Sequence, residues 1–220
     1  MGYQKLTDED ALEGFNVVCP TFTTAGTNPV TGQPYNTVVL SDIALVGDNV
    51  KLRTDNLQIF NENGETAAMY QWRANGWYDL DEGEYVNETV IDRAQGVVID
   101  SANGEITIRS TGEVCADAVS VDDCAEGFNV VGNPFPVDLT LAEISLTGDN
   151  VKLRTDNLQI FNENGETAAM YQWRANGWYD LDEGEYVNET PFPYGLGVIV
   201  DSANGGITVE IESPASLASL

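Results

Sequence analysis

Apolar and polar residues alternate in short runs along this chain, which is the pattern expected of half-buried β-strands. In residues 66–72 the alternation places Ala68, Tyr70 and Trp72 on one face of a strand. A short apolar run lies just upstream, and an Asn-Gly pair separates the two segments. Residues 57–72 therefore predict a β-hairpin with an Asn-Gly turn.

Turn signals recur along the rest of the chain. Ala-Asn-Gly stands at 74–76, and Ser-Ala-Asn-Gly at 101–104 separates two further apolar runs. The only helix-like stretches, 40–43 and 141–144, are too short for more than one turn. Short strands with a turn about every ten residues predict an all-β protein of the β-sandwich kind, jelly-roll-like or Ig-like.

The chain contains an internal duplication. Residues 47–89 recur letter for letter as residues 148–190, and the flanking segments match in part. We therefore expect two tandem β-sandwich domains, 1–110 and 111–220, that fold alike and share their core residues. The first domain carries an extra Thr-, Gly- and Pro-rich loop at 21–36.

The charge balance narrows the range of partners. The chain has 36 acidic residues, 9 basic residues and no histidine, which gives a formal net charge of -27. Nucleic acid is excluded as a partner, because its phosphates require clustered Lys and Arg. No apolar run is long enough for membrane insertion. The like charge repels copies of the chain from one another unless cations screen it.

The N-terminal segment and the composition bear on localisation. No signal peptide is visible in the opening residues, which resemble folded sequence. The Asn- and Gly-rich strand-and-turn style is typical of secreted β-proteins. We therefore expect an extracellular or cell-surface protein in its mature form, with a leader already removed.

The three cysteines can form one disulfide, which leaves one cysteine outside it. Cys115 and Cys124 bracket a short segment between the repeats and are candidates for a disulfide, worth up to roughly 2–3 kcal/mol. Cys19 aligns with Gly132, so the second repeat has no equivalent. We expect Cys19 to be a buried thiol, with an intermolecular bond as the alternative.

Each repeat carries the same aromatic set, two Trp and one Tyr around the second turn. Its members are Trp72, Trp77 and Tyr78 in the first repeat, and Trp173, Trp178 and Tyr179 in the second. If these rings are exposed and coplanar they would stack on sugar rings, and two copies would add avidity. The alternative is that Trp72 packs in the core and Trp77 covers its end.

Each repeat also carries an acidic cluster beside a glycine. The candidate cation ligands are Asp79, Asp81 and Glu84, copied as Asp180, Asp182 and Glu185. Carboxylates this close together could hold Ca²⁺, which takes six to eight oxygen ligands. The spacing does not match an EF-hand, and the alternative is a solvated acidic loop.

Nothing in the sequence indicates catalysis. An acidic chain offers many carboxylate pairs for glycoside hydrolysis, but the sequence cannot single one out. Histidine is absent, and no Ser or Cys stands in a recognisable nucleophile setting. We therefore expect no catalytic residues and a protein that is not an enzyme.

Residues 126–136 read Glu-Gly-Phe-Asn-Val-Val-Gly-Asn-Pro-Phe-Pro. This segment resembles the "GfNlvGNPfP" motif of secreted bacterial surface β-repeat proteins, and the hairpin and the closing strands downstream are similar too. The resemblance implies a cell-surface or extracellular β-domain with no activity attached. The first repeat departs from the motif at 19–22, where Cys-Pro-Thr-Phe stands in place of Gly-Asn-Pro-Phe.

These observations favour a non-enzymatic extracellular subunit of a bacterial surface layer or fibre, whose partners are copies of itself. The alternative is a lectin-like, carbohydrate-binding module that holds glycans on the paired Trp and Tyr sets. Exposed sheet edges accept strands from other chains. We therefore expect one of the terminal segments, 2–6 or 206–212, to contact a neighbouring subunit.

Overall fold

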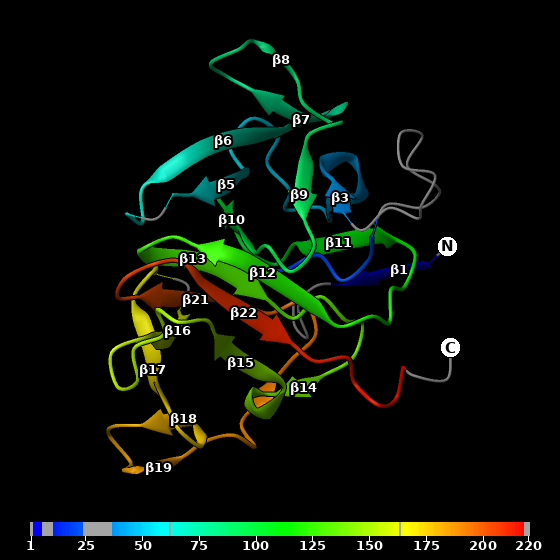
Figure 1. The fold of residues 1–220 in the computed structure, drawn as a ribbon. Helices are drawn as coiled ribbons and strands as arrows, with labels where there is room; N and C mark the ends of the chain where they lie inside the picture. Colours follow the sequence, from blue (N-terminus) through cyan, green and yellow to red (C-terminus); the bar gives the residue numbers. More distant parts are fainter. Residues whose placement is uncertain (1, 6–10, 24–36, 62, 163, 218–220) are drawn as a thin grey trace.

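The computed structural model describes residues 2–5, 11–23, 37–61, 63–162 and 164–217 of the 220-residue chain. It is an all-β structure made of two similar halves in tandem, β1–β11 and β12–β22 (Figure 1). The predicted all-β class and the predicted tandem of β-sandwich-like domains are confirmed. No helix in the described segments is long and apolar enough to cross a membrane.

The described part of the first half contains strands and one short 3₁₀ turn. Its elements are β1 (Gly2–Lys5), β2 (Gly14–Val18), β3 (Thr37–Val39), η1 (Leu40–Asp42), β4 (Ile43–Val46), β5 (Asn56–Phe60), β6 (Thr66–Arg73), β7 (Gly76–Asp79), β8 (Glu84–Tyr85), β9 (Val90–Asp92), β10 (Val97–Ser101) and β11 (Thr107–Gly112).

The second half repeats this order element by element. It consists of β12 (Val119–Cys124), β13 (Gly127–Gly132), β14 (Leu139–Thr140), η2 (Leu141–Glu143), β15 (Ile144–Thr147), β16 (Asn157–Phe161), β17 (Thr167–Arg174), β18 (Gly177–Asp180), β19 (Glu185–Tyr186), β20 (Pro191–Phe192), β21 (Gly197–Ser202) and β22 (Ile207–Ile211).

Each half has the same three antiparallel sheets. In the first half a six-stranded sheet runs β2-β10-β5-β6-β7-β8, a three-stranded sheet runs β1-β11-β4, and β3 pairs with β9. The second half has the orders β13-β21-β16-β17-β18-β19, β12-β22-β15 and β14-β20. Tyr70 lies opposite Leu57, and Tyr171 lies opposite Leu158, so the repeats share both strand order and register.

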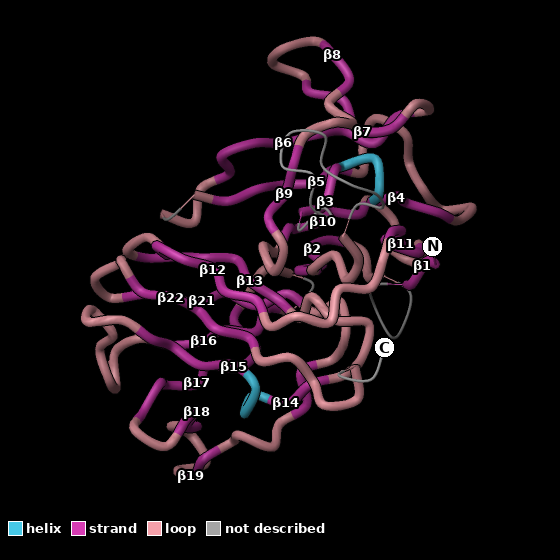
Figure 2. The backbone as a smooth tube through the Cα atoms, turned by 45° about the vertical axis from the view of Figure 1, so that its right-hand side comes forward, coloured by secondary structure: helices cyan, strands magenta, loops and turns pink. Residues whose placement is uncertain are grey.

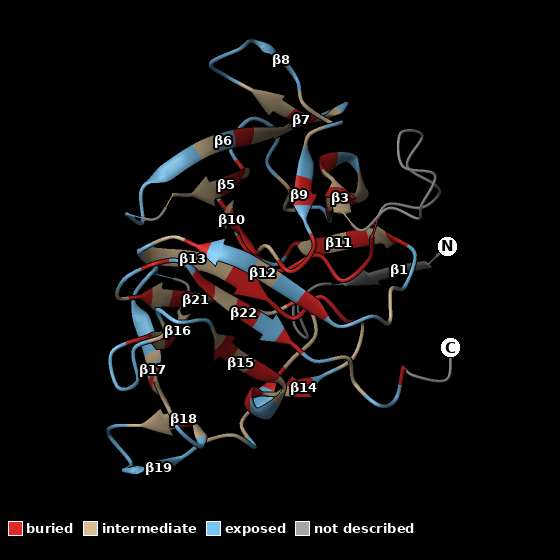
Figure 3. Cartoon of the chain, in the orientation of Figure 1, coloured by how far each residue is buried: buried red, intermediate tan, exposed pale blue. Residues whose placement is uncertain are grey.

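The core of each half lies between its six-stranded and its three-stranded sheet (Figure 3). In the first half Leu57 and Ile99 of the larger sheet and Ile43 of the smaller one are fully buried. Trp77 is also fully buried, and its Nε1 donates a hydrogen bond of 2.8 Å to the Ile43 carbonyl. This bond fixes the outer part of the large sheet to the small one.

The predicted hairpin is confirmed as β5 and β6. In its turn the Asn61 side-chain oxygen accepts hydrogen bonds from the backbone N–H groups of Asn63 and Glu65, at 3.0 and 2.9 Å. Gly64 has a φ of +74°, which favours glycine. Met69 is exposed and Tyr70 is buried, so the two faces that the alternation distinguishes are an outer and an inner one.

The two halves meet through contacts that are repeated reciprocally, so that they are related by an approximate two-fold axis. The Gly132 N–H donates to the Ala94 carbonyl at 3.0 Å. At the equivalent place on the other side, the Cys19 N–H donates to the Gly195 carbonyl at 2.8 Å. The inner strands β2 and β13 therefore each lie against the opposite half (Figure 2).

Side chains repeat this reciprocity. The Gly64 turn lies against the Phe128 ring, where an added Cβ would be 2.9 Å from Cδ2. The equivalent turn at Gly165 lies against the Phe15 ring, where the distance would be 3.4 Å. Each hairpin turn thus rests on a phenylalanine of the other half.

One position on the axis breaks the symmetry. Cys19 and Gly132 are equivalent in the repeats, and they lie against one another across the axis. A Cβ on Gly132 would be 2.5 Å from the Cys19 Cβ and 2.5 Å from the Leu196 carbonyl oxygen. The space therefore holds one side chain and not two, and Cys19 fills it as the expected buried thiol.

The variant Gly132→Ala should lose roughly 1–3 kcal/mol of unfolding free energy, because the new methyl group overpacks the axis. Urea unfolding of the full-length chain measures the loss. The same substitution made after Cys19→Gly should cost less, since one of the two opposing groups is then gone. Equal losses in the two backgrounds would contradict the direct contact.

Candidate interaction surfaces

The tryptophans are part of the core. Trp77 and Trp178 have 0% of their surface exposed. Trp72 and Trp173 pack on them with ring centroids 4.8 and 4.9 Å apart. The rings pack inside the sandwich, but with the expected roles exchanged, because Trp77 and Trp178 lie in the core and Trp72 and Trp173 are partly buried against them. Neither Trp77 nor Trp178 is available to stack on a sugar.

The tyrosines lie on the outer face of the six-stranded sheet. The Arg73 guanidinium carbon stands 3.4 Å from the centroid of the Tyr78 ring, and Tyr85 meets that ring edge-on at 5.2 Å. Tyr179 has the same arrangement, with Arg174 again at 3.4 Å. One face of each ring is thus already covered by an arginine, which leaves little of it for a sugar.

The acidic residues organise the turn between β7 and β8. The Asp79 carboxylate accepts the N–H groups of Asp81 and Glu82 at 2.8 and 3.0 Å, and Asp180 does the same in the second half. Among the described residues no three carboxylate or cysteine side chains converge on a point that could hold a metal. Calcium binding by Asp81, Glu84 and their copies Asp182 and Glu185 stays a prediction without geometric support.

The disulfide candidates are separate in the structure. Cys115 and Cys124 are both free thiols, as is Cys19. The Cys115 carbonyl accepts a hydrogen bond of 2.7 Å from Arg93, while the Cys124 Sγ lies 3.4 Å from the Val121 carbonyl. Burial raises the pKa of the Cys19 and Cys124 thiols, which keeps them protonated and poorly reactive.

The two terminal segments differ in whether they have an edge open to a strand of another chain. β22, the core of the predicted connector 206–212, lies between β12 and β15 and is paired on both sides. It therefore has no open edge for a further strand, and a contact of this segment with a neighbouring subunit through strand pairing is not supported. β1 pairs with β11 on one side and ends the three-stranded sheet. Residue 6 of the predicted N-terminal connector lies outside the described residues.

The outer strands β8 and β19 end the six-stranded sheets in the described part of the chain. The Val86 N–H donates to the Trp77 carbonyl at 3.0 Å, so Val86 and Trp77 are a hydrogen-bonded pair between β7 and β8. Because hydrogen-bonded positions alternate along an antiparallel pair, the N–H and C=O of Tyr85 point toward the open side. Tyr186 occupies the same position in β19.

The two open edges lie at opposite ends of the molecule. β8 and β19 are the most distant elements from one another in both views of the chain (Figures 1 and 2). The inner strands β2 and β13, by contrast, contact the other half. Contact between the halves therefore covers the inner edges of the two six-stranded sheets and leaves their two outer edges, whose sequences are identical, open.

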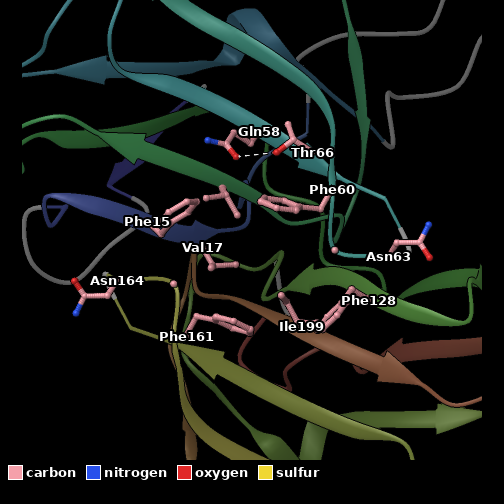
Figure 4. A pocket seen from close by; sticks show the side chains of 13 residues that line it. Phe15, Val17, Gln58, Phe60, Asn63, Thr66, Phe128, Phe161, Asn164 and Ile199 are labelled. Carbon is pink, nitrogen blue, oxygen red and sulfur yellow. Dashed lines mark hydrogen bonds between the residues drawn. The ribbon is translucent and has the colours of Figure 1, made fainter.

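A cavity of about 360 Å³ lies between the halves, with more of its lining residues from the first half than from the second. Phe15 and Phe60 line one side of it and Phe128 and Phe161 the other (Figure 4). The remaining lining residues are Val17, Gln58, Asn63, Gly64, Thr66 and Val98 from the first half, and Asn164, Gly165 and Ile199 from the second. Among the described residues, none of the side chains that line the cavity is charged.

The sequence reasoning missed this cavity, and it missed Asp55. The fully buried Asp55 carboxylate accepts hydrogen bonds from the N–H groups of Lys51 and Ala102 at 2.7 and 2.8 Å, so it connects two loops.

A signal for the cavity was present in the sequence of β5. Phe60 shares a face with Gln58, which is the face that the alternation assigns to polar residues.

Comparison with known proteins leaves the family open. No protein-family model, curated protein or solved structure matches this chain. The resemblance to secreted bacterial surface β-repeat proteins therefore stays a prediction, and function has to be argued from the geometry above.

Proposed function

We propose that this chain is a non-enzymatic structural subunit that works outside the cell and assembles with copies of itself into a surface layer or fibre. The observation that carries the proposal is the pair of identical open sheet edges, β8 and β19, at opposite ends of one molecule. The Tyr85 and Tyr186 backbone groups on these edges are oriented to pair with another strand.

The arrangement of the ends favours a linear polymer. Each end can engage one partner, and the two ends carry the same sequence because residues 47–89 and 148–190 are identical. If the edge pairs with its own copy, every molecule joins two neighbours and growth continues in one direction. A protein with a single repeat would form a dimer and stop growing, whereas the tandem chain can keep adding molecules at both ends.

Charge controls this association. Asp81, Glu82 and Glu84 lie on or beside the β8 edge, and the whole chain carries a net charge of -27. Two such edges repel one another in water of low ionic strength, so cations have to screen them before strands can pair. This requirement suits assembly in an external medium rich in salts.

Other features support a structural role. The large aromatic side chains stabilise the core, and Trp77 donates a hydrogen bond to the three-stranded sheet. Asp79 stabilises the turn between β7 and β8 by accepting a backbone hydrogen bond. The resemblance of residues 126–136 to the motif of secreted bacterial surface β-repeat proteins supports an extracellular location. The lectin-like alternative loses its main support, because Trp77 and Trp178 are buried.

The double variant Tyr85→Pro with Tyr186→Pro should abolish polymers seen for the unaltered chain. Proline removes the outward N–H at each edge and leaves the internal ladder bond of Val86 in place. Either single variant keeps one open edge and should give dimers only. Electron microscopy and analytical ultracentrifugation measure the products.

The matched control is Tyr85→Ala with Tyr186→Ala, which removes the same rings but keeps the backbone N–H groups. This variant should still polymerise. Polymers that persist in the double proline variant would show that β8 and β19 are not the connectors, provided near-ultraviolet circular dichroism shows the fold intact.

Raising the salt concentration should increase polymerisation. Between about 0.01 M and 0.15 M salt the screening length falls from about 30 Å to about 8 Å, so repulsion between acidic edges weakens. Light scattering during a NaCl titration measures the effect. Scattering that stays constant or falls as salt is added counts against edge-to-edge assembly.

Asp81→Asn with Asp182→Asn provides the charge control. These side chains are exposed, and it is their backbone N–H groups that bond to Asp79 and Asp180. The variant should polymerise at lower salt than the unaltered chain. A parallel titration with CaCl₂ at matched ionic strength separates screening from specific binding, because only specific binding gives calcium an additional effect.

A further inference from the structure

The cavity between the halves is large enough for a small organic molecule. An apolar cavity of about 150 Å³ in another protein is known to bind benzene. The present cavity, at about 360 Å³, has room for roughly two aromatic rings. It also lies within the size range of pockets that bind small ligands, about 300–1,000 Å³.

The walls of the cavity are apolar on both sides. Phe15 and Phe60 of the first half face Phe128 and Phe161 of the second across the axis (Figure 4). Val98, which is 3% exposed, forms part of the wall between them. Such walls favour an apolar ligand, because moving apolar surface out of water lowers the free energy. The flat phenylalanine rings favour an aromatic ligand, because aromatic rings stack on one another.

Of the polar side chains that line the cavity, those of Thr66 and Gln58 already have partners within the protein. The Thr66 hydroxyl donates to the Gln58 side-chain oxygen at 3.2 Å, and the Gln58 nitrogen donates to Asn56 at 2.8 Å. Asn63 and Asn164 lie at opposite ends of the cavity (Figure 4). A polar ligand loses its hydrogen bonds to water when it enters the cavity. The wall therefore offers it few hydrogen bonds as replacements.

Charge excludes an acidic ligand. Within the described segments no lysine or arginine lines the cavity, and the chain as a whole carries a net charge of -27. A carboxylate or sulfonate would give up its hydration without gaining a cationic partner. The occupant that fits the walls is therefore neutral.

We propose that this cavity is a binding site for one small, neutral, aromatic molecule of about two rings. The site exists only where both halves meet, because its walls come from both. One chain should therefore bind one ligand, although it contains two repeats. A site inside each repeat would bind two.

The probe for the test is 2-acetyl-6-dimethylaminonaphthalene, a neutral two-ring aromatic ketone whose fluorescence rises and shifts to shorter wavelength in apolar surroundings. Titration of the full-length chain at low salt, where polymers should be scarce, should give one bound probe per chain with a micromolar Kd. The two-ring anion naphthalene-2-sulfonate should displace this probe at least tenfold more weakly than neutral naphthalene does, because the cavity offers its charge no partner.

Thr66→Trp should weaken binding of the neutral probe at least tenfold, because the indole occupies the cavity. Thr66 is exposed on β6, so the fold should tolerate the change. Thr167→Trp is the matched control. Thr167 makes the equivalent hydrogen bond to Gln159, at 3.3 Å, but does not line the cavity. This control should change the Kd less than about twofold.

A measurement on the unaltered chain tests the location directly. In methyl NMR spectra the probe should shift the signals of Val17, Val98 and Ile199, which line the cavity, and not those of Leu52 and Leu80, which are exposed elsewhere.

Two probes per chain, equal binding by the Thr66→Trp variant, or shifts confined to Leu52 and Leu80 would each overturn the proposal. Displacement of the probe when chains associate would also overturn it, by identifying a second copy as the occupant. Polymerisation of the edge variants is a separate readout, so failure of either proposal can be recognised without the other.

Discussion

The architecture depends on how closely the backbones of the two halves approach at their axis. Gly96 and Gly197 occupy equivalent places there, and a Cβ on either would lie 2.7 Å from a valine methyl of the opposite half. Together with Gly132 they allow main chain to lie against main chain, so that N–H and C=O groups bond across the axis. Larger residues would hold the halves apart and lose these bonds.

This close approach determines both proposed interaction sites. It covers the inner edges of the two large sheets and directs their outer edges to opposite ends. It also brings together the outer faces of the sheets near β2 and β13, where the phenylalanine rings meet without filling the space. The open edges and the cavity are thus two results of one packing arrangement, although they concern different partners.

The sequence predicted what is local and repeated. Alternation placed Tyr70 and Met69 on opposite faces of a strand, the Asn-Gly pair located the β5–β6 turn, and the identical segments implied identical sheets. The contact between halves could not be predicted in this way, because Gly64 and Phe128 are distant in the chain and neither stands out in its own strand. Whether the cysteine pair or the tryptophans would be exposed likewise depends on tertiary packing rather than on local pattern.

The single cysteine on the axis has a consequence for how two repeats came to share one chain. A homodimer of either repeat would place two identical residues at this point, so the space would hold two side chains or none. Joining the repeats covalently removes that constraint, because Cys19 and Gly132 can then differ. A tandem chain can therefore fill a symmetric interface with one side chain, which no pair of identical subunits can do while keeping its two-fold symmetry.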